Sequence, residues 1–83
     1  MTVYVDDMKA PYGRMIMCHM IADSKEELLA MADTIGVQRK WIQKEGSIYE
    51  HFDVSLSMKQ KAIRAGAVQV SRKKLVEIMR RKL

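Results

Sequence analysis

Alternating apolar and polar positions predict two strands near the beginning of the chain. In residues 2–6, two valines alternate with polar side chains and a tyrosine, and β-branched and aromatic residues favour a pleated strand. Residues 15–21 alternate as well, and both of their faces are largely apolar, which is typical of a strand covered on both sides. Because Pro11 and Gly13 break this pattern, we expect a loop over residues 7–14.

Apolar residues at helical spacing predict three helices, each preceded by a serine that can cap its first turn. The candidate caps are Ser24, Ser55 or Ser57, and Ser71. The first helix has the clearest signals, because Glu27 completes a capping box and Gly36 suits the left-handed residue that ends a helix. In the second helix we expect Leu56 to be buried and Lys59 to be exposed. In the third helix we expect Leu83 on the buried face.

Three further segments lie between the helices and complete the pattern. Residues 37–43 are expected to return to the sheet, with Trp41 or Ile42 as the core anchor. Residues 48–54 and 67–70 are expected to be extended. The resulting order of strand, strand, helix, strand, helix, strand, helix favours an α/β fold. We therefore predict three helices packed on a mixed sheet of three to five short strands.

Length and composition favour a single small domain over residues 1–83, because a chain of this size supports one hydrophobic core. The apolar fraction of 48% argues against disorder. The longest apolar run is interrupted by His19 and is too short to span a bilayer. Asp6 and Asp7 stand where a secretory leader would carry basic residues. A lone Cys18 excludes an intrachain disulfide, so we expect a reduced, cytoplasmic protein without membrane contact.

Positive charge is concentrated near the end of the chain. The protein has 15 basic and 10 acidic residues, a net charge of +5. Residues 53–83 contain nine of the bases but only two of the acids, Asp53 and Glu77. Such a concentration attracts phosphates, although solvated helix faces would carry the same residues without a partner. The candidate anion-binding residues are Lys59, Arg64, Arg72, Lys73 and Lys74.

Several short motifs follow one another along the chain in a recognisable order. They are Val3-Tyr4-Val5-Asp6, Gly13-Arg14-Met15, Cys18-His19-Met20, Ala22-Asp23, Glu27-Leu28, Ile35-Gly36, Trp41-Ile42-Gln43, His51-Phe52-Asp53-Val54, and Ala62 with Gly66-Ala67-Val68. Their order and spacing resemble the family catalogued as domain of unknown function 4031, which comprises short proteins of bacteria and tailed phages. The resemblance covers nearly the whole chain and implies membership without an assigned activity. Phe52 stands where the family pattern usually has tyrosine.

The polar residues that coincide with these motifs form the candidate site. They are Asp6, His19, Asp23, His51 and Asp53. His51 and Asp53 are two residues apart, so on a strand they share one face, and a carboxylate beside an imidazole can select its tautomer. Each residue also has a purely structural interpretation. Asp23 is expected to help cap the first helix, and His19 could be a hydrogen-bonded core histidine.

Three kinds of function follow from these residues. The leading hypothesis is a binding module for an anionic partner, either a nucleic acid or a nucleotide-like ligand, held by the basic residues and selected by the histidines and Asp53. The alternative is a metal-dependent phosphoesterase or nuclease in which Asp6, His19, His51 and Asp53 activate water. The third is an interaction protein that forms a homodimer through methionine-rich surface.

No cofactor is predicted from motif spacing, because the chain has no H-E-x-x-H, cysteine cluster or calcium-binding loop. A divalent metal remains an alternative. Its ligands would be His19 and His51 together with Asp53 or Asp6, provided that these side chains converge.

Overall fold

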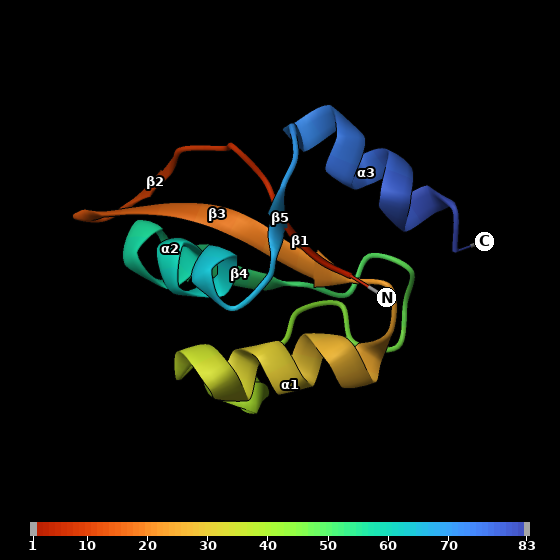
Figure 1. Ribbon diagram of the computed structural model, residues 1–83. Helices are drawn as coiled ribbons and strands as arrows, with labels where there is room; N and C mark the ends of the chain where they lie inside the picture. The colour runs from red at the N-terminus through yellow and green to blue at the C-terminus, as the bar shows by residue number, and fades with distance from the viewer. Residues whose placement is uncertain (1, 83) are drawn as a thin grey trace.

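The computed structural model of this protein describes residues 2–82, apart from the side chain of Tyr12. Within this part of the chain, three α-helices pack on a five-stranded mixed sheet (Figure 1). The strands are β1 (Val3–Val5), β2 (Ala10–Tyr12), β3 (Met15–Ala22), β4 (Phe52–Ser55) and β5 (Val68–Gln69). The helices are α1 (Lys25–Ile35), α2 (Leu56–Arg64) and α3 (Arg72–Arg80), with a short 3-10 helix η1 (Arg39–Trp41) between α1 and β4. The predicted α/β fold class is confirmed.

The sheet is built around β3. Along one edge of β3, β4 pairs in the antiparallel direction. Along the other edge, β2 pairs with the first part of β3 and β1 pairs with its last part, both antiparallel. β5 then lies parallel to β1 and completes the mixed sheet. Between Val5 and Ala10 this second edge of β3 has no strand partner, and Asp6 lies in the break.

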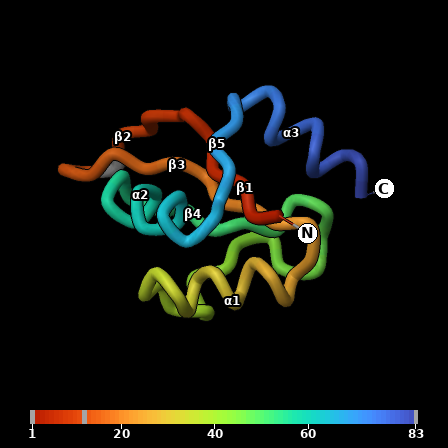
Figure 2. Tube along the Cα trace, viewed as in Figure 1, coloured from red at the N-terminus to blue at the C-terminus, as the bar shows by residue number. Residues whose placement is uncertain are grey.

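Two helices cover one face of the sheet, and the third covers part of the other face (Figures 1 and 2). α1 and α2 pack over the face on which Phe52 is the largest fully buried side chain. On the opposite face, Leu75 and Met79 of α3 pack against Ile21. Met15, at the other end of β3, is 50% exposed. The expectation that both faces of this strand are covered is therefore confirmed only for its second half.

Serine side chains begin all three helices, as predicted. Ser24 accepts a hydrogen bond from the backbone N–H of Glu27 and donates to the carboxylate of that residue, which makes a complete capping box. Ser55 caps α2 and Ser71 caps α3 in the same way, each accepting from a backbone N–H three residues later. Local sequence places the starts of α1 and α3, because each cap satisfies a backbone donor within its own first turn. For α2 it leaves two candidate serines, of which Ser55 is the cap.

The predicted loop over residues 7–14 is wrong in part, because it contains β2. This strand forms a hairpin with β3, and Gly13 adopts the left-handed conformation in the turn, with φ of 62°. Pro11 is compatible with β2 because this strand lies at the edge of the sheet. At an edge, the backbone N–H that proline lacks leaves no acceptor on a second neighbouring strand unpaired.

Residues 37–43 return to the sheet less completely than expected. Their central part is the 3-10 helix, and Trp41 is 62% exposed, so it is not a core anchor. Ile42 is only partly buried and packs at the margin of the core. The segment meets the sheet only at Gln43, which forms an isolated bridge with His51 just before β4.

Three side-chain expectations are also corrected. Leu56 is the first residue of α2 and is exposed, whereas Lys59 is only 7% exposed because it lies on the same helix face as the buried Ala62. The residue at the N-cap of α1 is Ser24, whereas the carboxylate of Asp23 accepts from the backbone N–H of Thr2 and extends the pairing of β1 with β3. The expected position of Leu83 lies outside the described residues. None of the helices in residues 2–82 has the length and apolar character needed to cross a membrane.

Cys18 is buried in the core on the α1 and α2 side of β3. Burial, with a smaller contribution from the negative charge of Asp6, raises the pKa of the Cys18 thiol from 9.0 to about 11. We expect the native thiol to react with a disulfide reagent at pH 8 at least about 100-fold more slowly than the unfolded thiol, because a two-unit shift lowers the thiolate fraction by that factor. Stopped-flow absorbance with and without denaturant measures this. A Val68→Cys variant in a Cys18→Ala background, at an exposed position, should react at the unfolded rate.

Candidate functional site

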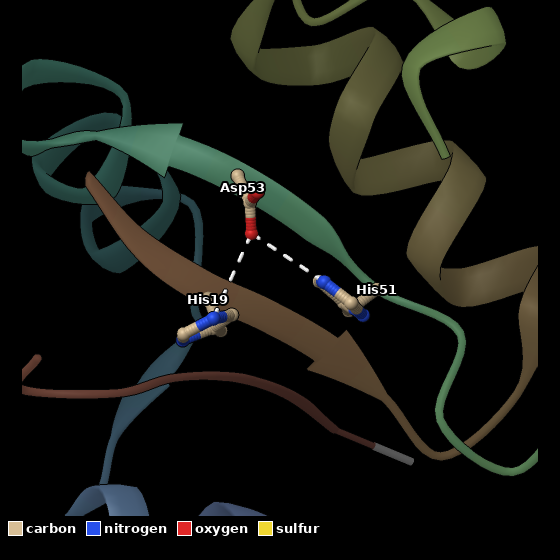
Figure 3. A group of neighbouring side chains, drawn as sticks. All are labelled: His19, His51 and Asp53. Carbon is tan, nitrogen blue, oxygen red and sulfur yellow. Dashed lines mark ion pairs between the residues drawn. The ribbon is translucent and has the colours of Figure 1, made fainter. Parts of the chain in front are cut away.

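Three polar side chains from the sequence-predicted set converge on the face of the sheet opposite α1 and α2. Figure 3 shows His19, His51 and Asp53 pointing toward one another. His19 lies in the middle of β3 and is directly opposite Asp53 of β4, so the strand register places both on one face. His51 precedes Asp53 by two residues and shares its face, as predicted.

The three side chains meet at one carboxylate oxygen. Oδ1 of Asp53 lies 3.4 Å from Nε2 of His51 and 3.7 Å from Nε2 of His19 (dashed lines in Figure 3). The two imidazole rings have centroids 5.4 Å apart and are inclined at 64°. One ligand-type atom from each residue lies within 4.8 Å of the other two. All three side chains are partly exposed, so the cluster is accessible to solvent.

In each imidazole ring, the nitrogen that faces away from Asp53 is hydrogen-bonded to an oxygen acceptor. Nδ1 of His19 lies 2.8 Å from Oδ2 of Asp6, and Nδ1 of His51 lies 2.8 Å from the backbone oxygen of Tyr49. A carboxylate and a carbonyl oxygen only accept hydrogen bonds, so Nδ1 is the donor in both rings. In the neutral rings, the lone pairs are therefore on the two Nε2 atoms that face Asp53.

Asp6 lies behind His19 and is not one of the three converging side chains. It is fully buried, and its Oδ1 accepts from the backbone N–H of His19 at 2.9 Å and of Met8 at 3.3 Å. These bonds replace strand pairing in the break between β1 and β2. Asp6 therefore orients the His19 ring from behind and does not belong to the cluster of His19, His51 and Asp53. The sequence could not distinguish this position from membership of the cluster.

Gln43 holds the remaining oxygen of Asp53. Its side-chain Nε2 donates to Oδ2 of Asp53 at 2.6 Å, and its backbone forms two hydrogen bonds with His51. Sequence reasoning did not include this residue in the site. Its position in the Trp41-Ile42-Gln43 motif was the available signal, since that motif places a polar side chain directly after two apolar ones.

Two cavities border the cluster, and His19 lines both of them. The first, which we call the Trp41 cavity, has a volume of about 650 Å³ and includes Trp41, Gln43 and Asp53 in its lining. The second, which we call the Arg72 cavity, has a volume of about 350 Å³ and includes His51, Lys44 and Arg72. A ligand that contacts the cluster can therefore extend to either side of His19.

The five basic residues predicted to bind an anion do not form one surface. Lys59 and Arg64 belong to α2, whereas Arg72, Lys73 and Lys74 belong to α3, and these helices lie on opposite faces of the sheet (Figure 1). Lys59 is also buried, which removes it from the solvent-facing set. Within this group, Arg72 alone lines a cavity beside the histidines.

Lys44 is a basic residue of the site that the sequence analysis missed. It lies between η1 and β4 with φ of 54°, a backbone conformation that is rare for lysine. Strained backbone of this kind often marks positions where surrounding structure holds a side chain for function. Lys44 and Arg72 together place two positive charges in the lining of one cavity with His19 and His51.

Comparison with known proteins assigns the chain to a family. Residues 3–82 match the family described as "Protein of unknown function (DUF4031)". The chain belongs to the DUF4031 family. No curated protein and no solved structure gives a significant match. In this DUF4031 chain, Phe52 is fully buried on the core face, whereas Asp53 lies on the face that carries the candidate site.

Asp6 provides a test of the proposed ring orientation. In Asp6→Asn, the side-chain oxygen can still accept the two backbone N–H bonds, which leaves the amide NH₂ facing Nδ1 of His19. We expect the neutral His19 ring to change to the tautomer protonated at Nε2, while His51 remains protonated at Nδ1. Long-range nitrogen–proton NMR correlation reports both rings. An unchanged His19 tautomer in the folded variant would contradict the assignment.

Proposed function

We propose that this protein is a metal-dependent phosphoesterase whose divalent cation is bound by His19, His51 and Asp53. The observation that supports this most is the shared orientation of the two imidazoles. Each ring donates from Nδ1 to an oxygen acceptor and directs Nε2 toward the same carboxylate oxygen. Metal-binding histidines characteristically have this outer hydrogen bond, which selects the tautomer and holds the ring in place.

The distances within the cluster also suit a metal ion. A tetrahedral ion with bonds of about 2.1 Å separates its ligand atoms by about 3.4 Å. The separations from Asp53 Oδ1 to the two Nε2 atoms are 3.4 and 3.7 Å. Direct N–H···O hydrogen bonds would instead bring these atoms to about 2.7–3.2 Å. Two of the three separations thus match those of ligands around one ion, and all three atoms lie within 4.8 Å of one another.

Two histidines and one carboxylate supply three ligands and leave at least one position for water. A divalent metal in such a site lowers the pKa of its bound water and makes hydroxide available near neutral pH. The same ligand set also binds iron(II) in oxygenases. Lys44 and Arg72 favour hydrolysis of a phosphoester over oxygenation, because they line the cavity beside the cluster with positive charge.

The two cations have different roles in this proposal. The Arg72 guanidinium can donate two parallel hydrogen bonds to phosphate oxygens, whereas the Lys44 ammonium acts as a point charge. The proposal keeps the anionic partner expected from the sequence, a nucleic acid or a nucleotide-like ligand, and limits its contact to the one side of the sheet that carries the histidines. Binding without turnover is the alternative that the following measurements distinguish.

Metal binding and turnover test the proposal directly. We expect protein that has been freed of metal with a chelator to take up one equivalent of Zn²⁺, Mn²⁺ or Co²⁺. The loaded protein should then hydrolyse bis(p-nitrophenyl) phosphate. His51→Ala should reduce both metal affinity and turnover at least about 100-fold, because it removes one of three ligands. Calorimetry and p-nitrophenolate absorbance measure the two effects. Asp33→Ala is the matched control, since Asp33 is an exposed carboxylate of α1 that pairs with Arg39 of η1.

The outcomes separate the proposed functions. Protein that binds no metal and has no turnover would contradict the phosphoesterase and leave anion binding alone. Turnover that is equal in the wild type and His51→Ala would contradict the assignment of the ligands.

Arg72 and Arg64 form a matched pair for testing the substrate position. Both are exposed arginines, but they lie on opposite faces of the sheet. Arg72→Ala should raise KM about tenfold with a smaller change in kcat, because it removes a charged hydrogen-bond donor from phosphate. Arg64→Ala should leave KM unchanged. Steady-state kinetics at two salt concentrations measure this, and equal effects of the two variants would show that only overall charge matters.

A further inference from the structure

We infer that the Trp41 cavity binds a nucleobase, so that the substrates are phosphoesters of nucleosides. This inference rests on the proposed function and adds the substrate class. It is carried by an exposed tryptophan in a cavity that shares His19 with the Arg72 cavity and also reaches Asp53. The base would lie on one side of His19, and the phosphate would lie on the other side.

Trp41 has no role in the core of the protein. It is 62% exposed on η1, and the ammonium of Lys40 lies over its ring, 5.2 Å from the ring centre. This cation–π contact holds the indole while leaving most of its surface open. Exposed aromatic side chains are common platforms for nucleobases, because every base has a flat face that can stack.

The remaining lining of the Trp41 cavity suits a flat, mostly apolar group with polar edges. Pro11 and Met17 contribute apolar surface from the β2–β3 hairpin, and Val37 contributes it from the segment after α1. A volume of about 650 Å³ lies within the usual range for small-molecule sites. The cavity is therefore large enough for a base and its sugar.

Gln43 provides a polar contact for the edge of such a base. Its amide nitrogen donates to Asp53, and its amide oxygen has no hydrogen-bond donor among residues 2–82. An amide oxygen accepts from exocyclic amino groups or ring N–H groups of bases. A lipid chain would use the apolar lining of the cavity but not this acceptor, which favours a nucleobase.

The geometry of the two cavities sets the order of groups in the ligand. His19 lines both cavities, Asp53 lines the Trp41 cavity, and His51 lines the Arg72 cavity. A phosphoester at the cluster would therefore have its cationic contacts on the side of Arg72 and Lys44. Its organic group would extend toward Trp41. A nucleotide combines a flat base and a phosphoester in this order.

Intrinsic fluorescence provides a direct test, because Trp41 is the single tryptophan of the chain. The titrations use the full chain in EDTA, so that they do not depend on metal binding. We expect adenosine and adenosine monophosphate to quench the emission with saturation, whereas ribose 5-phosphate should not. Failure of adenosine to quench at millimolar concentration, or equal quenching by ribose 5-phosphate, would overturn the inference. Stronger quenching by octyl phosphate than by adenosine would identify a lipid-type ligand and overturn it as well.

Variants then test stacking without relying on the tryptophan signal. Calorimetry with adenosine monophosphate should show about tenfold weaker binding for Trp41→Ala, because stacking supplies that much affinity per base. Trp41→Phe retains an aromatic face and should remain within about threefold of the wild type. Val68→Ala is the control for loss of an exposed apolar side chain outside the cavity and should bind normally. Equal affinity of the alanine and wild-type proteins would contradict stacking on Trp41.

The inference and the proposed function can fail separately. Metal-dependent hydrolysis of bis(p-nitrophenyl) phosphate without any adenosine binding would leave the phosphoesterase in place and remove the nucleobase site. Saturable adenosine binding without metal uptake or turnover would leave the nucleobase site in place and remove the phosphoesterase.

Discussion

The hydrogen bonds of Asp6 are the contacts on which the candidate site depends. β1 ends one residue before Asp6, and the carboxylate replaces the missing strand partner by accepting from the backbone of His19. Its second oxygen accepts from the His19 ring. A fully buried carboxylate is costly unless it is hydrogen-bonded, and here three donors offset the loss of water. One side chain thus stabilises the interrupted sheet and orients the imidazole.

Incomplete coverage of the sheet makes the site accessible. α3 packs over the end of β3 that contains Ile21 and leaves the cluster around His19 open to solvent. The opposite face is closed by α1 and α2 over a continuous apolar core that includes Phe52. The larger apolar core and the candidate site therefore lie on opposite faces of one sheet. This separation lets the exposed face carry charged and aromatic side chains, because the core on the other side maintains the fold.

The basic residues that the sequence concentrates in one third of the chain do not form one positively charged surface in the fold. The fold divides the basic residues between two faces of the sheet, and burial removes Lys59 from the surface. Arg72 remains beside the histidines and is joined there by Lys44 from the acidic part of the sequence. Net charge in a segment consequently indicates attraction to anions, whereas strand order decides where an anion can bind.

Local patterns in the sequence predict the helices, the α/β class and the position of His51 and Asp53 on one face, because serine caps and strand alternation act over a few residues. The sequence by itself could not place His19 opposite Asp53, put Asp6 behind the ring or bring Gln43 to the carboxylate, because these contacts depend on register and on where strands end. Nor could it show that Trp41 is exposed, since apolar spacing is the same for a core residue and for one that lines an open cavity. Tertiary structure decided these positions because they join segments whose separation along the chain carries no local signal.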